Sequence, residues 1–243
     1  MGSLLFTREY MCVPISTGTS LFNVEYIDRA KNKDLILKPM RREGYRYFVG
    51  IDPAISTDGD YNVITVLEVD DDENKSIVYV DRAKNVQFRE NIDKVKMINA
   101  IFKPEGILFE TNTFAKSFTQ ELRNVADVNV KDFNTTRRKK QEIILNLQMS
   151  LENAKMSFPY GNEESRRVTT ALVEELSMFA INENGKFEGV GAHDDMVMSL
   201  ALANAATYKT TDKFILLDDV GIFDEPKQSR GRITPNPFIG LNF

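Results

Sequence analysis

The chain has 243 residues, of which 42% are hydrophobic, which is enough for one large or two small domains and excludes a chain that is disordered throughout. Its one cysteine and one histidine exclude an internal disulfide and a Cys/His zinc site, so any bound metal must be held by carboxylates. The 31 Lys and Arg against 36 Asp and Glu give a net charge of -5, which argues against a protein that coats nucleic acid non-specifically but does not exclude a nuclease.

The first part of the chain, residues 1–42, has no sustained hydrophobic period, and turn residues gather at 16–19. We therefore expect an irregular lead-in segment there. Three runs rich in β-branched and aromatic residues follow, each typical of a strand, at 46–51, 61–69 and 76–80. The acidic turn between the second and third runs predicts an antiparallel hairpin.

Helices and strands then alternate along the chain. The hydrophobic spacing predicts helices at 88–102, 114–125, 138–154 and 165–179, and short strands at 106–109, 128–133 and 156–159. The Asn-Gly pair at 184–185 predicts a hairpin between 178–181 and 186–190, and a last apolar helix is expected at 194–207. These elements predict an α/β domain with a mixed sheet over residues 43–210, followed by a flexible tail at 211–243.

Acidic residues fall where these elements begin or end. Asp52 follows the first strand directly, Glu110 follows the strand at 106–109, and Asp194 and Asp195 open the last helix. Open α/β sheets place their sites at the carboxyl ends of strands. Two divalent ions need several carboxylates from different elements, so these four residues are candidate metal ligands. In the loop after Asp52, Asp58 is either a turn residue or an outer ligand, and Asp60 is interpreted as a turn residue.

Structural explanations exist for each acid taken singly. Asp194 could cap the last helix, Asp52 could begin a turn with Pro53, and Glu110 could lie in a solvated loop. Three such acids at converging ends of one domain favour a functional site. His193, just before the acids, is either a structural loop residue or a proton donor or orienter of Asp194.

Three segments carry a family resemblance. Residues 48–54, 107–112 and 191–201, which include Gly-Ile-Asp-Pro, Phe-Glu-Thr-Asn and His-Asp-Asp, resemble the acidic motifs of the nuclease domain of large terminase subunits. These are the DNA-packaging motors of tailed bacteriophages. The resemblance covers about residues 45–208 and implies an RNase H-like, RuvC-like fold, with a central mixed β-sheet flanked by helices on both faces.

The resemblance also implies an activity, a two-metal endonuclease that cuts concatemeric double-stranded viral DNA, with Asp52, Glu110 and Asp195 as catalytic ligands and Asp194 adjacent. Hard oxygen ligands favour Mg²⁺ or Mn²⁺, and two ions are expected. One ion, on Asp52 and the last aspartate, would activate water, and the other, on Asp52 and Glu110, would stabilise the leaving 3′-oxygen. Calcium should bind without supporting cleavage.

DNA would be held by local clusters of cations. Arg137, Arg138, Lys139 and Lys140 stand together at a helix start, and Arg166 and Arg167 open the next long helix. A helix start also offers free amide hydrogens to a phosphate. The alternative for both clusters is a solvated charged face.

The resemblance further implies partners and a location. The family carries a packaging ATPase domain on the amino-terminal side, and residues 6–10 resemble the junction that follows it. The chain has no Gly-x-x-x-x-Gly-Lys-Ser/Thr phosphate loop, so ATP hydrolysis is not assigned to it. Expected partners are viral DNA, the portal protein, the small terminase subunit and the ATPase half of the same polypeptide. The expected location is the host cell cytoplasm during virion assembly.

No run approaches the roughly 20 apolar residues of a membrane span, so we expect a soluble protein without a membrane partner.

Two other classes of protein remain open at this point. Another RNase H-like enzyme, such as a Holliday-junction resolvase or a transposase, would share the acids but select branched or end-specific DNA. A non-catalytic interaction domain would use the same acids only as caps and turn residues.

Overall fold

The computed structural model describes residues 20–53, 61–111, 120–122, 129–181, 186–189 and 193–208. The chain divides into two compact units, Met1–Thr211 and Asp212–Phe243, and every described residue belongs to the first. None of the described helices is long and apolar enough to cross a membrane.

The described elements alternate between helix and strand through most of the chain. In chain order they are α2 (Val24–Ala30), β1 (Lys31–Asn32), β2 (Arg46–Asp52), β3 (Asn62–Val69), β4 (Lys75–Ala83), α3 (Phe88–Phe102), β5 (Gly106–Thr111), β6 (Val130–Asn134), α5 (Arg137–Glu152), β7 (Met156–Pro159), α6 (Glu163–Met178), β8 (Phe179–Ile181), β9 (Phe187–Gly189) and α7 (Asp195–Thr207).

Seven strands form one mixed sheet in the order β1-β7-β4-β3-β2-β5-β6. The two contacts of β3, with β2 and β4, are antiparallel, and the other neighbours are parallel. The hairpin predicted from the acidic turn is the β3–β4 pair. β3 lies in the middle of the sheet, and all eight of its residues are buried. The strands β8 and β9 pair antiparallel, as expected for the second hairpin.

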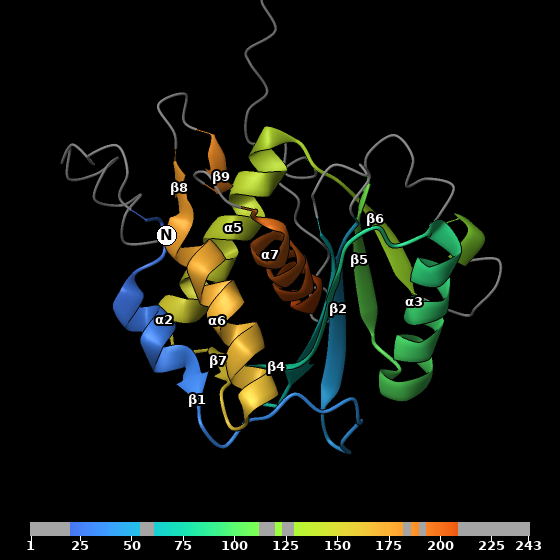
Figure 1. The fold of residues 1–243 in the computed structure, drawn as a ribbon, viewed down its shortest axis with the longest axis horizontal. Helices are drawn as coiled ribbons and strands as arrows, with labels where there is room; N and C mark the ends of the chain where they lie inside the picture. The colour runs from blue at the N-terminus through green and yellow to red at the C-terminus, as the bar shows by residue number, and fades with distance from the viewer. Residues whose placement is uncertain are drawn as a thin grey trace, which may run out of the picture. The chain divides into compact units, whose positions relative to one another are not determined.

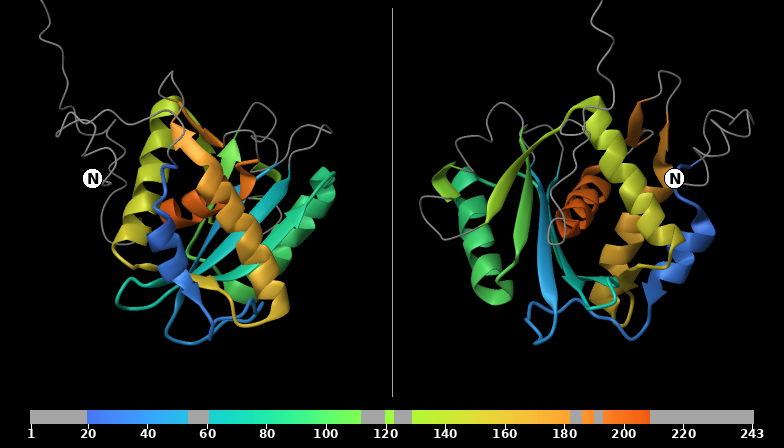
Figure 2. Two further views of the ribbon diagram at one scale, coloured as in Figure 1. Left: turned by 60° about the vertical axis from the view of Figure 1, so that its left-hand side comes forward. Right: turned by 180° about the vertical axis from the view of Figure 1, so that it is seen from behind.

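Helices cover both faces of this sheet, as the predicted fold class requires (Figures 1 and 2). On one face α7 lies against β2, β3 and β5, and α5 and α6 pack against α7. On the other face α3 packs over β2, β4 and β5 through a separate apolar cluster. Side chains of β2 alternate between the two, since Phe48 joins the α7 side while Val49 and Ile51 join the α3 side.

Helix α7 approaches β2 unusually closely, and Gly50 makes this possible. A Cβ atom at Gly50 would lie 2.0 Å from the Ser199 carbonyl oxygen and 2.3 Å from Ala203 N, which no side chain tolerates. Ser199 Oγ also donates to the Gly50 carbonyl at 2.9 Å. The amino-terminal half of α7 is therefore fixed directly over the carboxyl-terminal half of β2.

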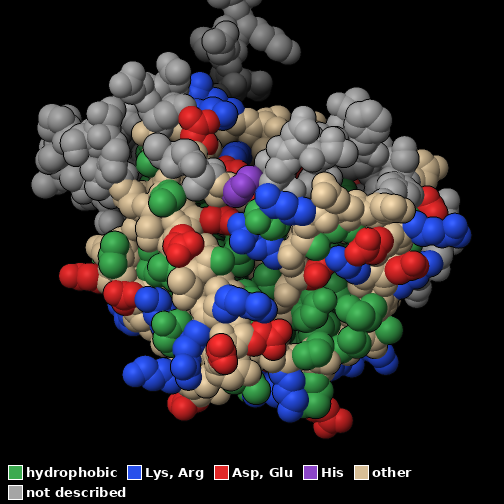
Figure 3. All heavy atoms as spheres, in the orientation of Figure 1, with side chains coloured by type: hydrophobic (Ala, Val, Ile, Leu, Met, Phe, Trp, Pro, Cys, Tyr) green, Lys and Arg blue, Asp and Glu red, His purple; other side chains and the backbone are tan. Residues whose placement is uncertain are grey.

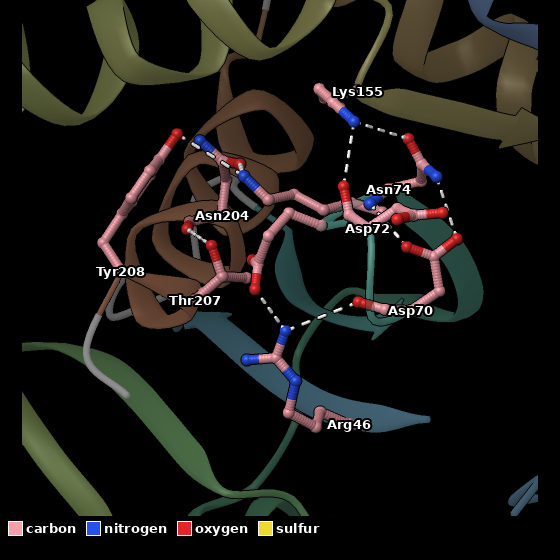
Figure 4. Close-up of polar contacts among 10 residues, drawn as sticks. Arg46, Asp70, Asp72, Asn74, Lys155, Asn204, Thr207 and Tyr208 are labelled. Atoms are coloured by element: carbon pink, nitrogen blue, oxygen red, sulfur yellow. Dashed lines mark hydrogen bonds and ion pairs between the residues drawn. The ribbon is translucent and has the colours of Figure 1, made fainter. Parts of the chain in front are cut away.

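The far end of α7 is tied to the turn between β3 and β4 (Figure 4). Buried Lys75, which opens β4, donates to Asn204 Oδ1 at 2.9 Å. Lys155 Nζ donates to the Asp72 carbonyl at 2.8 Å and to Asn74 Oδ1 at 3.1 Å. The bond from Lys75 fixes the turn to the last residues of α7, and the bonds from Lys155 hold the turn to the residue that precedes β7.

The expectation of an irregular lead-in was wrong for part of residues 20–42. This stretch contains α2, capped by Asn23, and β1, which pairs with β7 at the edge of the sheet. Leu21, Phe22 and Ile27 are buried in the core. A helix of seven residues is too short to show a hydrophobic period, and a strand of two residues is defined only by its distant partner.

Other predicted elements agree with the structure to within a few residues, or lie outside the described residues. Of the helix expected at 114–125 only 120–122 are described, and these are helical. The hairpin turn at 182–185 and the tail from 209 onward lie outside the described residues.

Candidate active site at the carboxyl ends of β2 and β5

Asp52 and Glu110 are neighbours on the same face of the sheet. Ile51 and Phe109 pair in the parallel ladder of β2 and β5, so the next residues of the two strands are also adjacent. Ile51 and Phe109 both pack on the α3 side. Because side chains alternate along a strand, Asp52 and Glu110 are directed to the opposite face, where α7 lies.

The amino-terminal end of α7 brings the remaining acids to this place. Asp195 is the first residue of α7, and Asp194 is its N-cap. Asp195 Oδ2 accepts a hydrogen bond from Tyr61 N at 3.0 Å and lies 3.6 Å from His193 Nδ1. The structure thus associates His193 with Asp195, whereas the sequence suggested Asp194 as its partner.

Asp194 does not act as a conventional helix cap. Its side chain makes no capping hydrogen bond, and its Oδ2 instead accepts from Lys140 Nζ at 2.8 Å. The simple capping explanation for Asp194 is therefore not the one that the structure supports. Lys140, expected to contact DNA, forms an ion pair at the acidic site.

A carboxylate from another helix caps α7 in place of Asp194. Glu175, on α6, accepts the N–H of Met196 at 2.8 Å and that of Val197 at 3.4 Å through Oε2. Its Oε1 accepts from Arg82 Nη2 at 3.0 Å. Glu175 is only 5% exposed, and burial raises its pKa to about 7, although the two N–H groups and Arg82 act in the opposite direction.

Sequence reasoning did not identify Glu175 as a member of the site. The signal was present but weak, since Glu175 stands three residues after Leu172 and one before Leu176, on the face of α6 that becomes buried. A charged residue on an apolar face indicates a buried partner, but the sequence does not say which one.

The other acids of the site lie close enough to Asp52 to raise its pKa. Burial raises the pKa of Asp52 well above its ordinary value, and the negative charges of Glu110 and Asp195, with a smaller effect of Asp194, raise it further. The four acids therefore form one electrostatically coupled cluster.

The donor set fits a divalent cation in type and in charge. All its donors are hard oxygens, and the unfavourable charge on half-buried Asp52 is of the kind that a bound cation relieves. Among the described residues, however, no three His, Cys, Asp or Glu side chains are already arranged around a common metal position. Binding an ion would therefore require the side chains to turn toward it. Asp58 and Asp60 lie outside the described residues.

The two predicted cationic clusters differ in their relation to the acids. Arg137–Lys140 form the first turn of α5, and Lys140 reaches Asp194. Arg166 and Arg167 lie at the other end of α6 from Glu175, and the nine residues from Arg166 to Glu175 span roughly 14 Å of helix. Arg166 donates to the Tyr160 carbonyl at 3.2 Å and lines a separate cavity with Lys33. The structure therefore brings the first cluster to the acids and not the second.

Comparison with protein families gives a match over most of the described fold. Residues 49–206 match the model of the terminase RNaseH-like domain. The matched range begins within β2 and ends within α7, so it includes the elements that carry Asp52, Glu110, Asp194 and Asp195. No curated protein matched the chain.

Several solved structures share the fold. The large terminase nuclease from thermophilic phage G20c with bound magnesium has 22% identity and a TM-score of 0.60, over 79% of this chain and 98% of that one. The large terminase nuclease domain of Thermus phage P74-26 has 21% identity and a TM-score of 0.55, over 77% and 95%. The large terminase of bacteriophage HK97 has 10% identity and a TM-score of 0.56, over 75% of this chain and 42% of that one.

Proposed function

The chain belongs to the family of terminase RNase H-like domains, and from this we propose that it is the metal-dependent endonuclease domain of a phage large terminase subunit. Its reaction would be hydrolysis of phosphodiester bonds in double-stranded viral DNA, including the cutting of concatemers. The observation that supports this best is the meeting of Asp52, Glu110, Asp194 and Asp195, from three separate elements, at one end of the sheet.

Two Mg²⁺ or Mn²⁺ ions are the proposed cofactors. Solved structures of the G20c nuclease contain magnesium, cobalt or zinc, which supports a divalent ion at the corresponding place here. Such ions would supply an activated water and would stabilise negative charge on the phosphate. Asp52, Glu110 and Asp195 would hold them, and Asp58 stays a candidate outer ligand.

The chain's own residues would orient these ligands. Tyr61 N and the Glu175 cap fix the first turn of α7, so Asp195 is held facing β2. Lys140 holds Asp194 and offsets part of the negative charge. His193 lies beside Asp195 at the edge of the site, where its side chain is 41% exposed.

DNA would approach this end of the sheet along the first turn of α5. Arg137, Arg138 and Lys139 would contact the phosphate backbone, with Lys140 linking them to the acids. Arg166 and Arg167 stay predicted DNA contacts. Because they lie at the far end of α6, a DNA duplex bound at the acids would have to extend along α6 to reach them. The packaging ATPase half of the same polypeptide, the portal protein and the small terminase subunit are proposed partners, and the host cytoplasm is the proposed location.

The test is cleavage by the wild-type chain and by Asp52→Asn, Glu110→Gln and Asp195→Asn, with circular dichroism to verify folding. We expect Mg²⁺- or Mn²⁺-dependent cleavage by the wild type and none by the variants. Asp71→Asn, which removes an exposed acid from the β3–β4 turn, is the matched control and should cleave normally. Retained cleavage by a folded Asp52→Asn protein would contradict the proposal. Preference for four-way junctions over linear duplex would instead indicate a resolvase.

A further inference from the structure

A second group of side chains borders the acids: Tyr61, Arg82 and Lys84, here called the Tyr61 cluster. Tyr61 precedes β3 directly, and Arg82 and Lys84 lie at the end of β4 that pairs with this part of β3. Because Asn62 pairs with Ala83, Tyr61 and Lys84 lie side by side just beyond the ladder. Tyr61 N is also the donor to Asp195 Oδ2, so the cluster adjoins the acidic site.

Two cations share the ring of Tyr61. The guanidinium carbon of Arg82 lies 3.8 Å from the ring centroid, and Lys84 Nζ lies 4.4 Å from it. The His193 ring meets the same tyrosine edge-on, with centroids 5.3 Å apart. In Figure 3 the histidine, in purple, lies at the surface with Lys and Arg side chains beside it.

The charges of the two cations are balanced differently. Arg82 is paired with Glu175 at 3.0 Å. Lys84 is exposed, and within the part of the chain that the structure describes its ammonium forms no ion pair with a carboxylate. A cation–π contact restricts where the ammonium lies without neutralising it. Lys84 therefore presents a positive charge next to a strongly negative site.

The positive charge of Lys84 could help to bind DNA beside the acids. The four acids and a net charge of -5 repel a polyanion, so DNA affinity must come from cations close to the site. The geometry points to the Tyr61 cluster as a contact for the DNA backbone beside the acids, with Lys84 donating to a phosphate oxygen and Arg82 adding to the local positive potential. This inference rests on the proposed function, because it takes DNA as the substrate.

The test measures binding without cleavage. Affinity for a short fluorescent duplex is followed in chelator over a range of salt for the wild type, Lys84→Gln and Lys84→Arg. Loss of one phosphate contact should reduce the slope of log affinity against log salt by about 0.9, which is roughly five- to tenfold weaker binding at about 0.1 M salt. Lys84→Arg should restore most of the slope. Lys103→Gln removes an exposed lysine before the amino end of β5, the end away from Glu110, and should bind as the wild type does.

Two further measurements separate the possible failures. If Lys84→Gln binds DNA with an unchanged slope but shows altered Mg²⁺ affinity by calorimetry, the cluster only balances the charge of the acids and the inference is wrong. If the slope is unchanged while wild-type protein still cleaves DNA with Mg²⁺, the inference fails and the proposed function stands. If the wild type neither binds nor cleaves DNA, both are overturned.

Discussion

At the scale of single residues, the ionisation of Glu175 is expected to change the stability of the fold. It is buried, yet it accepts the first N–H groups of α7 and an ion pair from Arg82. Its pKa rises from an ordinary 4.5 to about 7 in the folded chain. The folded state therefore binds more protons than the unfolded state between these two values, and stability is lost as the pH rises through this window.

We predict that Glu175→Gln removes this part of the pH dependence. Between pH 4.5 and about 7 the free energy of unfolding of the wild type should fall relative to that of the variant, by up to about 3 kcal/mol at 1.36 kcal/mol per pKa unit. The measurement is urea unfolding in chelator across this pH range. Glu174→Gln, at the exposed neighbouring position, is the control and should keep the wild-type slope. Parallel curves for Glu175→Gln and the wild type would show that Glu175 does not titrate in this window.

The sequence indicated the acids better than their partners. Asp52 and Glu110 could be predicted because each directly follows a recognisable strand, so local pattern alone gives its position. The bonds of Asp194 to Lys140 and of Met196 N to Glu175 join residues 54 and 21 positions apart. Such pairs depend on how α5, α6 and α7 pack, which no local pattern contains.

At the scale of elements, the contact between α7 and β2 determines the geometry of the candidate site. One element carries Asp195 and the other Asp52, and they touch at Gly50 without an intervening side chain. A change in their separation therefore moves the two acids relative to each other.

Gly50→Ala should accordingly destabilise the fold and disrupt the site. The new methyl group would overlap backbone atoms of α7, and we expect a loss of at least about 3 kcal/mol in the free energy of unfolding. Gly106→Ala, on β5, is the matched control, because its Cβ would lie 3.7 Å from Phe48 Cδ1, an ordinary contact. Chemical denaturation of both variants measures the difference. Equal stability of the two variants would mean that α7 can shift away from β2 at little cost.

The elements that sequence reasoning recovered are those with their own hydrophobic pattern. β3 is rich in β-branched residues, and α3 has a clear helical period, so the predicted bounds of both elements lie close to the observed ones. β1 has only two residues and exists because Lys31 and Asn32 pair with Phe158 and Pro159, more than a hundred residues away. The presence of β1 in the sheet could not be predicted from the sequence of these two residues.

At the scale of the whole molecule, the core that the described residues form lies within the first compact unit. Its buried apolar residues run from Leu21 to Ala206, and the unit ends at Thr211. We therefore predict that a chain truncated after Thr211 folds with a melting temperature within about 2 °C of the full chain and keeps metal-dependent DNA cleavage. Thermal denaturation and a cleavage assay on both proteins test this. A large fall in melting temperature or loss of cleavage would assign a structural or catalytic role to residues 212–243.

The position of α7 at the end of the described chain has a consequence for the newborn protein. Ser199 Oγ donates a hydrogen bond to the Gly50 carbonyl, 149 positions earlier in the chain. A ribosome must therefore synthesise nearly the whole domain before α7 can pack on β2. At about 5–20 residues per second, Asp195 is made roughly 7 to 29 s after Asp52. During that interval the growing chain holds first Asp52 alone and then Asp52 and Glu110, without the acids of α7. On the proposed function, the capacity to cut arises only after α7 has been made and has packed on β2.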